Sequence, residues 1–188
     1  MADHRPLAHG LMMALAWGLL FPSGAFISLG WRTRFASGKW FALHRGVQAL
    51  GLVLTVIGVT VAFSMIPLGS HFDEPHHIVG LVLALLACCQ PINALWRAKP
   101  VEKTGGVRTT QRTVWELVHR GGGYAMICAA IYQAVSGSEL MDDDGLWPLI
   151  LYFVFLGASL VFLAVGLATR QASQAEVAQV KPADVPAA

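Results

Sequence analysis

The amino-acid sequence predicts an all-α integral membrane protein. Its 188 residues are 55% hydrophobic and only 13% charged, whereas an average soluble domain has about 25% charged residues. Five long stretches contain no charged residue at all, and each is near the roughly 17 to 25 residues with which a helix crosses a bilayer. Since a segment in lipid must satisfy its own backbone polar groups, long stretches without alternation predict helices that pack as a bundle.

The uncharged stretches place five transmembrane helices in one domain, residues 1–170. The first three helices follow from the stretches at 10–31, 46–70 and 78–96, and the last two from those at 121–138 and 145–169. With their flanking turns, the expected helices cover residues 8–31, 41–64, 76–96, 114–136 and 146–169. Residues 171–188 are rich in Ala, Gln, Val and Pro without an apolar period, which predicts a disordered cytoplasmic tail.

Charges in the loops predict how the bundle lies in the membrane. We call side A the face that holds the N-terminus and the loops at 65–76 and 136–145, and side B the opposite face. Side A carries one basic residue, Arg5, and seven acids: Asp3, Asp73, Glu74, Glu139, Asp142, Asp143 and Asp144. The loops and helix starts of side B carry ten basic residues: Arg32, Arg34, Lys39, Arg45, Arg97, Lys99, Lys103, Arg108, Arg112 and Arg120. Because basic loops favour the cytoplasm, we expect the N-terminus outside and the C-terminus in the cytoplasm.

Histidines at the starts of four consecutive helices form the candidate site. His9 and the neighbours His76 and His77 lie on side A, whereas His44 and His119 lie on side B. Ionisable residues within membrane helices mark function by default, and two imidazoles facing across a bundle suit the two axial positions of a haem iron. Two alternatives stay open. In the first, each histidine reaches for the lipid headgroups. In the second, the histidines bind zinc or copper, although two histidines at each face are fewer ligands than such a site needs.

The spacing of glycines supports a flat ligand. His76 and Gly80, like His119 and Gly123, follow the pattern H-x-x-x-G, which places the glycine one turn from the histidine on the same face of a helix. A glycine there leaves room for a macrocycle to lie against the helix. In the second helix Gln48 occupies the equivalent position.

Three arginines on side B are candidates to bind haem propionates or an anionic electron donor. Arg45 and Arg120 each directly follow a candidate histidine, and Arg112 lies three residues before Trp115. A guanidinium can hold a carboxylate with two hydrogen bonds. The alternative is that the charge bias of cytoplasmic loops supplies arginines at this face in any case.

Four motifs between Leu7 and Gly137 carry a resemblance to a known family. They are HGLMMALAWGLLFPSG, WFALHRGVQALG, HHIVGLVLALLACCQPINALWRAKP and RTVWELVHRGGGYAMI. Together they resemble the cytochrome b561 family, and in particular the transmembrane module that follows an extracellular DOMON haem domain in many proteins. No DOMON domain is found in this sequence, so we expect the outer electron partner to be a separate molecule.

The resemblance implies a four-helix core that binds two haem b groups, with the fifth, C-terminal helix added to it. It implies His9 and His76 as ligands of the outer haem and His44 and His119 as ligands of the inner one. The family's third-helix motif has its ligand four residues before the glycine, which selects His76 over His77.

The implied function is transmembrane electron transfer between a cytoplasmic-side reductant and an outer-side acceptor. A protein of this kind is an oxidoreductase of the ascorbate or ferric reductase type, although no segment matches the ascorbate motifs of plant and animal relatives. The expected partners are a small-molecule or protein electron donor and acceptor and the lipid bilayer, but no nucleic acid. The alternative function is that of a non-redox membrane subunit, or a metal-binding or transport partner with interfacial histidines.

The fifth helix contains neither a histidine nor a charge. Its small residues allow close helix contacts, so it packs on the core or forms a homodimer surface. These residues are Gly157, Ala158, Gly166 and Ala168.

Overall fold

The computed structural model describes residues 3–31, 38–97, 106–141 and 146–180, and its regular elements there are helices. The first helix is continuous and consists of α1 (Arg5–Met13), the π-helical turn η1 (Ala14–Leu20) and α2 (Phe21–Leu29). It is followed by α3 (Lys39–Met65) and α4 (Pro75–Leu95). A second composite helix consists of α5 (Thr110–Glu116), the π-helical turn η4 (Leu117–Gly121) and α6 (Gly122–Glu139), and α7 (Leu146–Val180) comes last.

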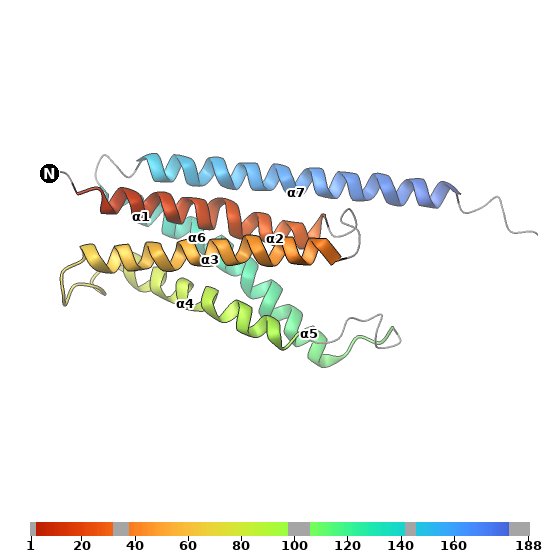
Figure 1. Ribbon diagram of the computed structural model, residues 1–188, viewed down its shortest axis with the longest axis horizontal. Coiled ribbons are helices and arrows are strands. Elements are labelled where there is room, and N and C mark those ends of the chain that lie inside the picture. The colour runs from red at the N-terminus through yellow and green to blue at the C-terminus, as the bar shows by residue number, and fades with distance from the viewer. Residues whose placement is uncertain (1–2, 32–37, 98–105, 142–145, 181–188) are drawn as a thin grey trace, which may run out of the picture.

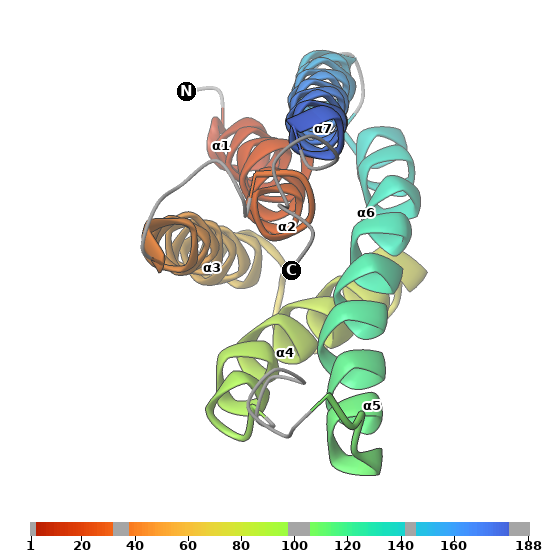
Figure 2. The same cartoon turned by 90° about the vertical axis from the view of Figure 1, so that its right-hand side faces the viewer.

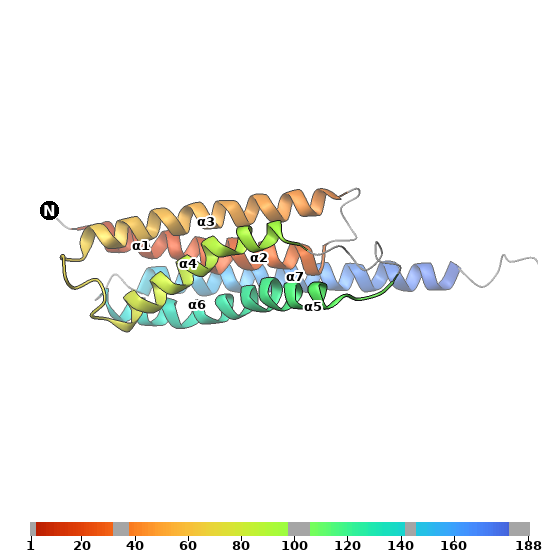
Figure 3. The ribbon, with the colours of Figure 1, turned by 90° about the horizontal axis from the view of Figure 1, so that it is seen from below.

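The helices form one elongated bundle. Figure 1 shows them running along a common axis, with α7 extending beyond the others. Viewed end on in Figure 2, α1 and α2 lie at the centre, with α3 and α7 on different sides of them. Figure 3 shows α4 and α6 crossing beside this group and running in opposite directions. The starts of α1 and α4 therefore lie at one end, which is side A.

The surface of the bundle is suited to lipid. Large apolar side chains on the outer faces of α3, α4 and α7 are half exposed, among them Leu50, Val53, Leu85, Val154 and Val161. Four helices are long and apolar enough to cross a membrane, by length and composition: Arg5–Leu29, Lys39–Met65, Pro75–Leu95 and Leu146–Ala175. These observations fit the predicted all-α integral membrane fold, since lipid covers the apolar outer surface of a membrane bundle.

The composite helix from Thr110 to Glu139 is not among these four. Polar side chains such as Gln133 and Ser136 on its inner face lower its hydropathy. The helix itself coincides with the predicted one at 114–136, but its membrane crossing stays a prediction.

The last helix is longer than predicted. We expected it to end at Thr169, whereas α7 continues to Val180. The residues after Thr169 are rich in Ala and Gln, which are good helix formers, and no proline occurs before Pro182. The predicted tail at 171–188 is thus helical in its first part, and residues 181–188 lie outside the described residues.

The π-helical turn η1 follows from a proline inside the first helix. Pro22 has no N–H and cannot bond to the carbonyl of Gly18 four residues earlier. The hydroxyl of Ser159 on α7 lies 3.2 Å from the Gly18 carbonyl oxygen and 3.3 Å from that of Leu19. Its oxygen also lies 3.1 Å from the hydroxyl of Ser23. A side chain of α7 therefore satisfies the carbonyls that the helix cannot.

Replacing Ser159 with alanine should lower the free energy of unfolding by about 1–3 kcal/mol, because it leaves a buried carbonyl without a donor. Unfolding in mixed micelles measures this loss. Ser28→Ala is the matched control, since the Ser28 hydroxyl only bonds back to Ala25 on its own helix. Equal losses for the two variants would contradict the role assigned to Ser159.

The last helix packs on the centre of the bundle. A Cβ atom on Gly18 would lie 2.8 Å from the Tyr152 carbonyl oxygen, and one on Gly166 would lie 2.5 Å from the Trp31 ring nitrogen. The Trp31 indole also donates to the Phe162 carbonyl at 3.1 Å. Of the two roles predicted for this helix, packing on the core is confirmed. Gly166 makes room for the Trp31 ring of the same chain.

Candidate cofactor-binding site

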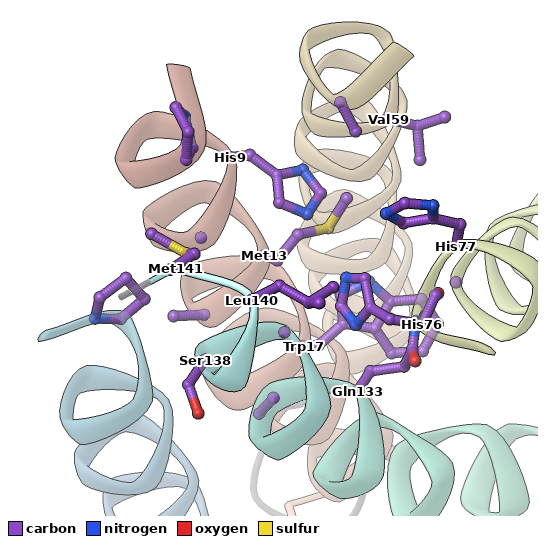
Figure 4. A pocket seen from close by; sticks show the side chains of 18 of the residues that line it. His9, Met13, Trp17, Val59, His76, His77, Gln133, Ser138, Leu140 and Met141 are labelled. Carbon is purple, nitrogen blue, oxygen red and sulfur yellow. Dashed lines mark hydrogen bonds between the residues drawn. The ribbon is translucent and has the colours of Figure 1, made fainter. Parts of the chain in front are cut away.

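A cavity of about 320 Å³ opens between the helices on side A. Four histidines line it: His9, His71, His76 and His77. Figure 4 shows His9 from α1 and His76 and His77 from α4 around the same space, with Trp17 below them. The floor is apolar and belongs to the buried core, which includes Trp17 and Tyr152. The cavity falls within the usual size range of ligand pockets, about 300–1,000 Å³.

The rings of His9 and His76 lie close together in the lining of this cavity. Their centroids lie 6.4 Å apart and their planes are at 81°. With metal–nitrogen bonds of about 2.0 Å, two imidazoles on opposite sides of one metal ion have centroids roughly 6 Å apart. The pair is therefore spaced as two ligands of one metal ion would be.

Backbone carbonyls hold one ring nitrogen of His9 and of His44. The Nδ1 atom of His9 lies 2.9 Å from the Gly58 carbonyl oxygen, and that of His44 lies 2.7 Å from the Gly24 carbonyl oxygen. A carbonyl only accepts, so Nδ1 carries the proton in both rings. The lone pair is left on Nε2, which is the arrangement of a metal-binding histidine.

His76 and His77 differ in how their rings are held. The Nδ1 atom of His76 lies 3.1 Å from the hydroxyl oxygen of Ser136, whereas the Nδ1 atom of His77 is buried without a hydrogen-bond partner among the described residues. Gln133 also donates to the His76 carbonyl at 3.0 Å. A neighbouring side chain thus holds the ring of His76 but not that of His77, and the choice of His76 as ligand stays a prediction.

The two glycines of the H-x-x-x-G pattern, Gly80 and Gly123, were expected to leave room for a flat ligand, and the structure shows different surroundings for each. A Cβ atom on Gly80 would lie 2.5 Å from the Gln133 amide nitrogen, so this glycine makes room for a neighbouring side chain. Around Gly123 nothing lies within 4 Å of such an atom. On Gly137 it would lie 2.6 Å from the His76 ring, so Gly137 provides the space for that ring.

On side B, aromatic rings stack on the two histidines. Trp115 stacks on His119 with centroids 4.9 Å apart, and Phe41 stacks on His44 with centroids 6.5 Å apart. The guanidinium carbon of Arg97 lies 5.2 Å from the Phe41 ring centroid and 5.9 Å from the Trp115 ring centroid. The charge of Arg97 is within electrostatic reach of both histidines. These contacts bring α3 and α5 together around one cation.

The three arginines expected at this site differ from one another in their contacts and exposure. Arg112 forms an ion pair with Glu116, with 2.7 Å between Nε and Oε1. Arg45 and Arg120 are exposed, and the guanidinium of Arg45 lies 5.0 Å from the Phe41 ring centroid. Arg97, which the sequence marks only as one of the basic residues of side B, lies against the two aromatic rings that stack on His44 and His119.

Two further parts of the site were not predicted from the sequence. Tyr152 is 2% exposed and lines the side A cavity from α7, and its hydroxyl has no hydrogen-bond partner among the described residues. Ser136 and Gly137 hold and accommodate His76 from α6. Single serines and glycines are common in membrane helices, so only the position of α6 beside α4 reveals their role.

Histidines gathered near both ends of a helical membrane bundle are typical of a membrane cytochrome of the b type. Residues 8–141 match the family described as "Eukaryotic cytochrome b561". The chain belongs to the cytochrome b561 family, and membership implies haem b as the cofactor. Side chains that fit this cofactor are present: two imidazoles with centroids 6.4 Å apart beside an apolar cavity, and Nδ1 atoms held so that Nε2 is available.

Similar proteins carry the same module within longer chains. A cytochrome b561, DM13 and DOMON domain-containing protein of Arabidopsis thaliana is 31% identical over 82% of this chain, which corresponds to 18% of the relative. A second Arabidopsis protein, described as containing cytochrome b561 and DOMON domains, is 32% identical over 82% of this chain and 37% of its own. A Danio rerio protein that carries the name of a ferric-chelate reductase is 26% identical over 76% of this chain.

The chain thus spans less than two fifths of the length of the first two relatives, and it matches them in their cytochrome b561 part. No solved structure matches the chain. Among the described residues, no group of three or more His, Cys, Asp or Glu side chains is placed to hold a metal ion.

Proposed function

We propose that the protein carries single electrons across the membrane through two haem b groups, each held by two histidines. The observation that carries this proposal is the orientation of the rings: in His9 and His44 a backbone carbonyl accepts from Nδ1, which leaves Nε2 as the ligand atom. In His76 the Ser136 hydroxyl oxygen lies where it can accept in the same way. His9 and His76 would hold the group on side A. His44 and His119 would hold the group on side B.

The chain's own residues keep both positions ready for binding. Hydrogen bonds at Nδ1 fix the ring planes and make each imidazole a stronger donor. The apolar floor around Trp17 and Tyr152 excludes water from the side A cavity. When bound, haem b supplies a one-electron couple between ferric and ferrous iron. Since each iron would keep both histidines, the chain needs little rearrangement during transfer.

The two histidine levels are separated along α3. Gly58, whose carbonyl accepts from His9, comes fourteen residues after His44, which corresponds to about 21 Å at 1.5 Å per residue. Trp17 is eight residues beyond His9 on the first helix and is buried between the levels. An aromatic ring there shortens the distance that an electron must cross through saturated groups.

The charges favour electron entry on side B, which we propose to be cytoplasmic, with the N-terminus outside. Arg97 near His44 and His119 attracts an anionic reductant and the carboxylates of a cofactor. On side A, acidic residues such as Asp73 and Glu74 favour a cationic acceptor, for which a ferric species or a basic protein surface is suitable. Asp142, Asp143 and Asp144, which contribute to this expectation, lie outside the described residues.

Electron transfer across a sealed vesicle tests the proposal. The haem-loaded protein is placed in vesicles that contain ferricyanide, and ascorbate is added outside. Reduction of the trapped ferricyanide should be faster than in vesicles without protein, and His44→Ala with His76→Ala in one chain should abolish the gain. A loaded protein that gives no gain in either orientation would contradict transmembrane transfer.

A further inference from the structure

The helices α4 and α6 share a spacing that the histidine pattern alone does not reveal. Counted from His76, a glutamine follows fourteen residues later and a hydrogen-bonding side chain seventeen residues later: Gln90 and Asn93. Counted from His119, the same two distances lead to Gln133 and Ser136. The segments are therefore a repeat of histidine, glutamine and a short polar side chain.

On side A, the second half of this repeat supports the histidine of the first. Gln133 donates to the His76 carbonyl at 3.0 Å, and the Ser136 hydroxyl oxygen lies 3.1 Å from the His76 Nδ1 atom. These contacts run from α6 to the start of α4. Because α4 and α6 are antiparallel neighbours (Figure 3), the repeat predicts reciprocal contacts from the end of α4 to η4.

On side B, the corresponding residues lie beside η4. Gln90 and Asn93 line a cavity of about 290 Å³ together with Leu117 and Val118, the residues just before His119. The Trp115 indole donates to the Asn93 carbonyl at 3.2 Å and stacks on the His119 ring. Asn93 is thus connected to the same turn of helix as His119.

Three buried polar atoms at this place have no hydrogen-bond partner among the described residues. They are the Nδ1 atom of His119, the Nδ2 atom of Asn93 and the Oε1 atom of Gln90. Leaving such atoms unpaired costs about 1–3 kcal/mol each. The Nδ1–H group of an iron-binding histidine and the Nδ2 amino group of Asn93 are both donors. They therefore cannot bond to each other in the present orientation of the Asn93 amide. Turning the amide by 180° brings its oxygen to the place of its nitrogen.

We propose that Asn93 is the positioning residue of His119: its side-chain oxygen accepts the Nδ1–H group of His119, as Ser136 does for His76. Gln90 corresponds to Gln133 and supports the backbone of η4. The inference rests on the proposed function, because it assigns Nε2 of His119 to an iron. The hydrogen bond makes the imidazole a stronger donor, and a stronger donor favours ferric over ferrous iron and lowers the reduction potential of the side B haem.

Three substitutions of Asn93 in the full chain test this role by redox titration of the purified, haem-loaded protein. Asn93→Leu removes the acceptor and should raise the potential of one haem only, by 59 mV for each tenfold loss of ferric preference. Asn93→Asp offers a charged acceptor and should lower the same potential. Asn93→Ser installs the side chain that the repeat has on side A and should stay near the wild type.

Ser136→Ala is the matched variant on side A and should raise the potential of the other haem. A reduction potential that rises in Asn93→Leu and falls in Asn93→Asp is the signature of a hydrogen bond to the ligand. A purely structural defect would move the potential of both variants in one direction. Shifts of the same sign, equal shifts of both haems, or an unmoved Asn93→Leu would overturn the inference. If Asn93→Leu does not fold, the aspartate and serine variants still decide it.

The wild type separates the two proposals. A wild-type chain without haem would contradict the proposed function before any variant is compared. A wild-type chain with two haems and potentials insensitive to residue 93 would contradict only the role of Asn93.

Discussion

Replacing His44 or His76 with alanine should reduce the haem content from two groups per chain to one. Each substitution removes one of two ligands at its own level and leaves the other pair, about 21 Å away along α3, untouched. The remaining haem should keep a low-spin spectrum, because both of its histidines persist. Haem extraction with a colour reagent, together with absorption spectra of oxidised and reduced protein, measures both quantities.

His77→Ala is the matched control for His76→Ala, since both histidines line the side A cavity from the same turn of α4. It should keep two haems, because no acceptor among the described residues holds its Nδ1 atom. If His77→Ala lost a haem and His76→Ala did not, the assignment of the ligand on α4 would be wrong by one residue.

Gly137→Val should remove the side A haem almost as effectively as loss of His76 itself. A Cβ atom at residue 137 would lie 2.6 Å from Cε1 and 3.3 Å from Nε2 of the His76 ring. The ring must then leave its place beside Ser136, and Nε2 moves with it. Valine is at least as good a helix former as glycine, so loss of haem would come from the displaced ring and not from an unfolded helix.

Gly157→Val serves as the control for this prediction, because no atom lies within 4 Å of a Cβ at that position of α7. It should retain two haems and the wild-type spectrum. A Gly137→Val protein with an unchanged spectrum would show that the His76 ring is not held where the structure has it.

The helices could be predicted because hydropathy is a local property of the sequence. The uncharged stretches predicted the helix positions to within a few residues for all but the last helix, whose end carries Ala and Gln in place of large apolar residues. The π-helical turn η1 was not predicted. Its free carbonyls are satisfied by Ser159, a residue far away in the sequence, whose hydroxyl donates to the Gly18 carbonyl.

The pairing of histidines could also be predicted, because consecutive membrane helices alternate in direction and bring odd-numbered helix starts to one face. The partners of their Nδ1 atoms could not, since Gly58 and Gly24 contribute only a backbone carbonyl, which every residue has. Gly80 shows the limit of spacing arguments. A glycine one turn from a histidine marks a close approach, but the approaching group is the Gln133 side chain.

The arginines of side B show a similar limit. Arg112 and Arg45 were singled out by their distance in sequence from Trp115 and His44, yet Arg112 is paired with Glu116. Arg97 comes just after the end of α4, and its approach to Phe41 and Trp115 depends on how α3, α4 and α5 converge. No local pattern encodes that convergence.

The central claim is that each end of the bundle holds one haem between two histidines. Electron paramagnetic resonance of the oxidised wild-type protein, combined with haem counted per chain, tests it most directly. The account predicts two haems per chain and two low-spin ferric signals, with no high-spin signal. A colourless protein from haem-replete cells, or a single haem with a high-spin signal, would contradict it.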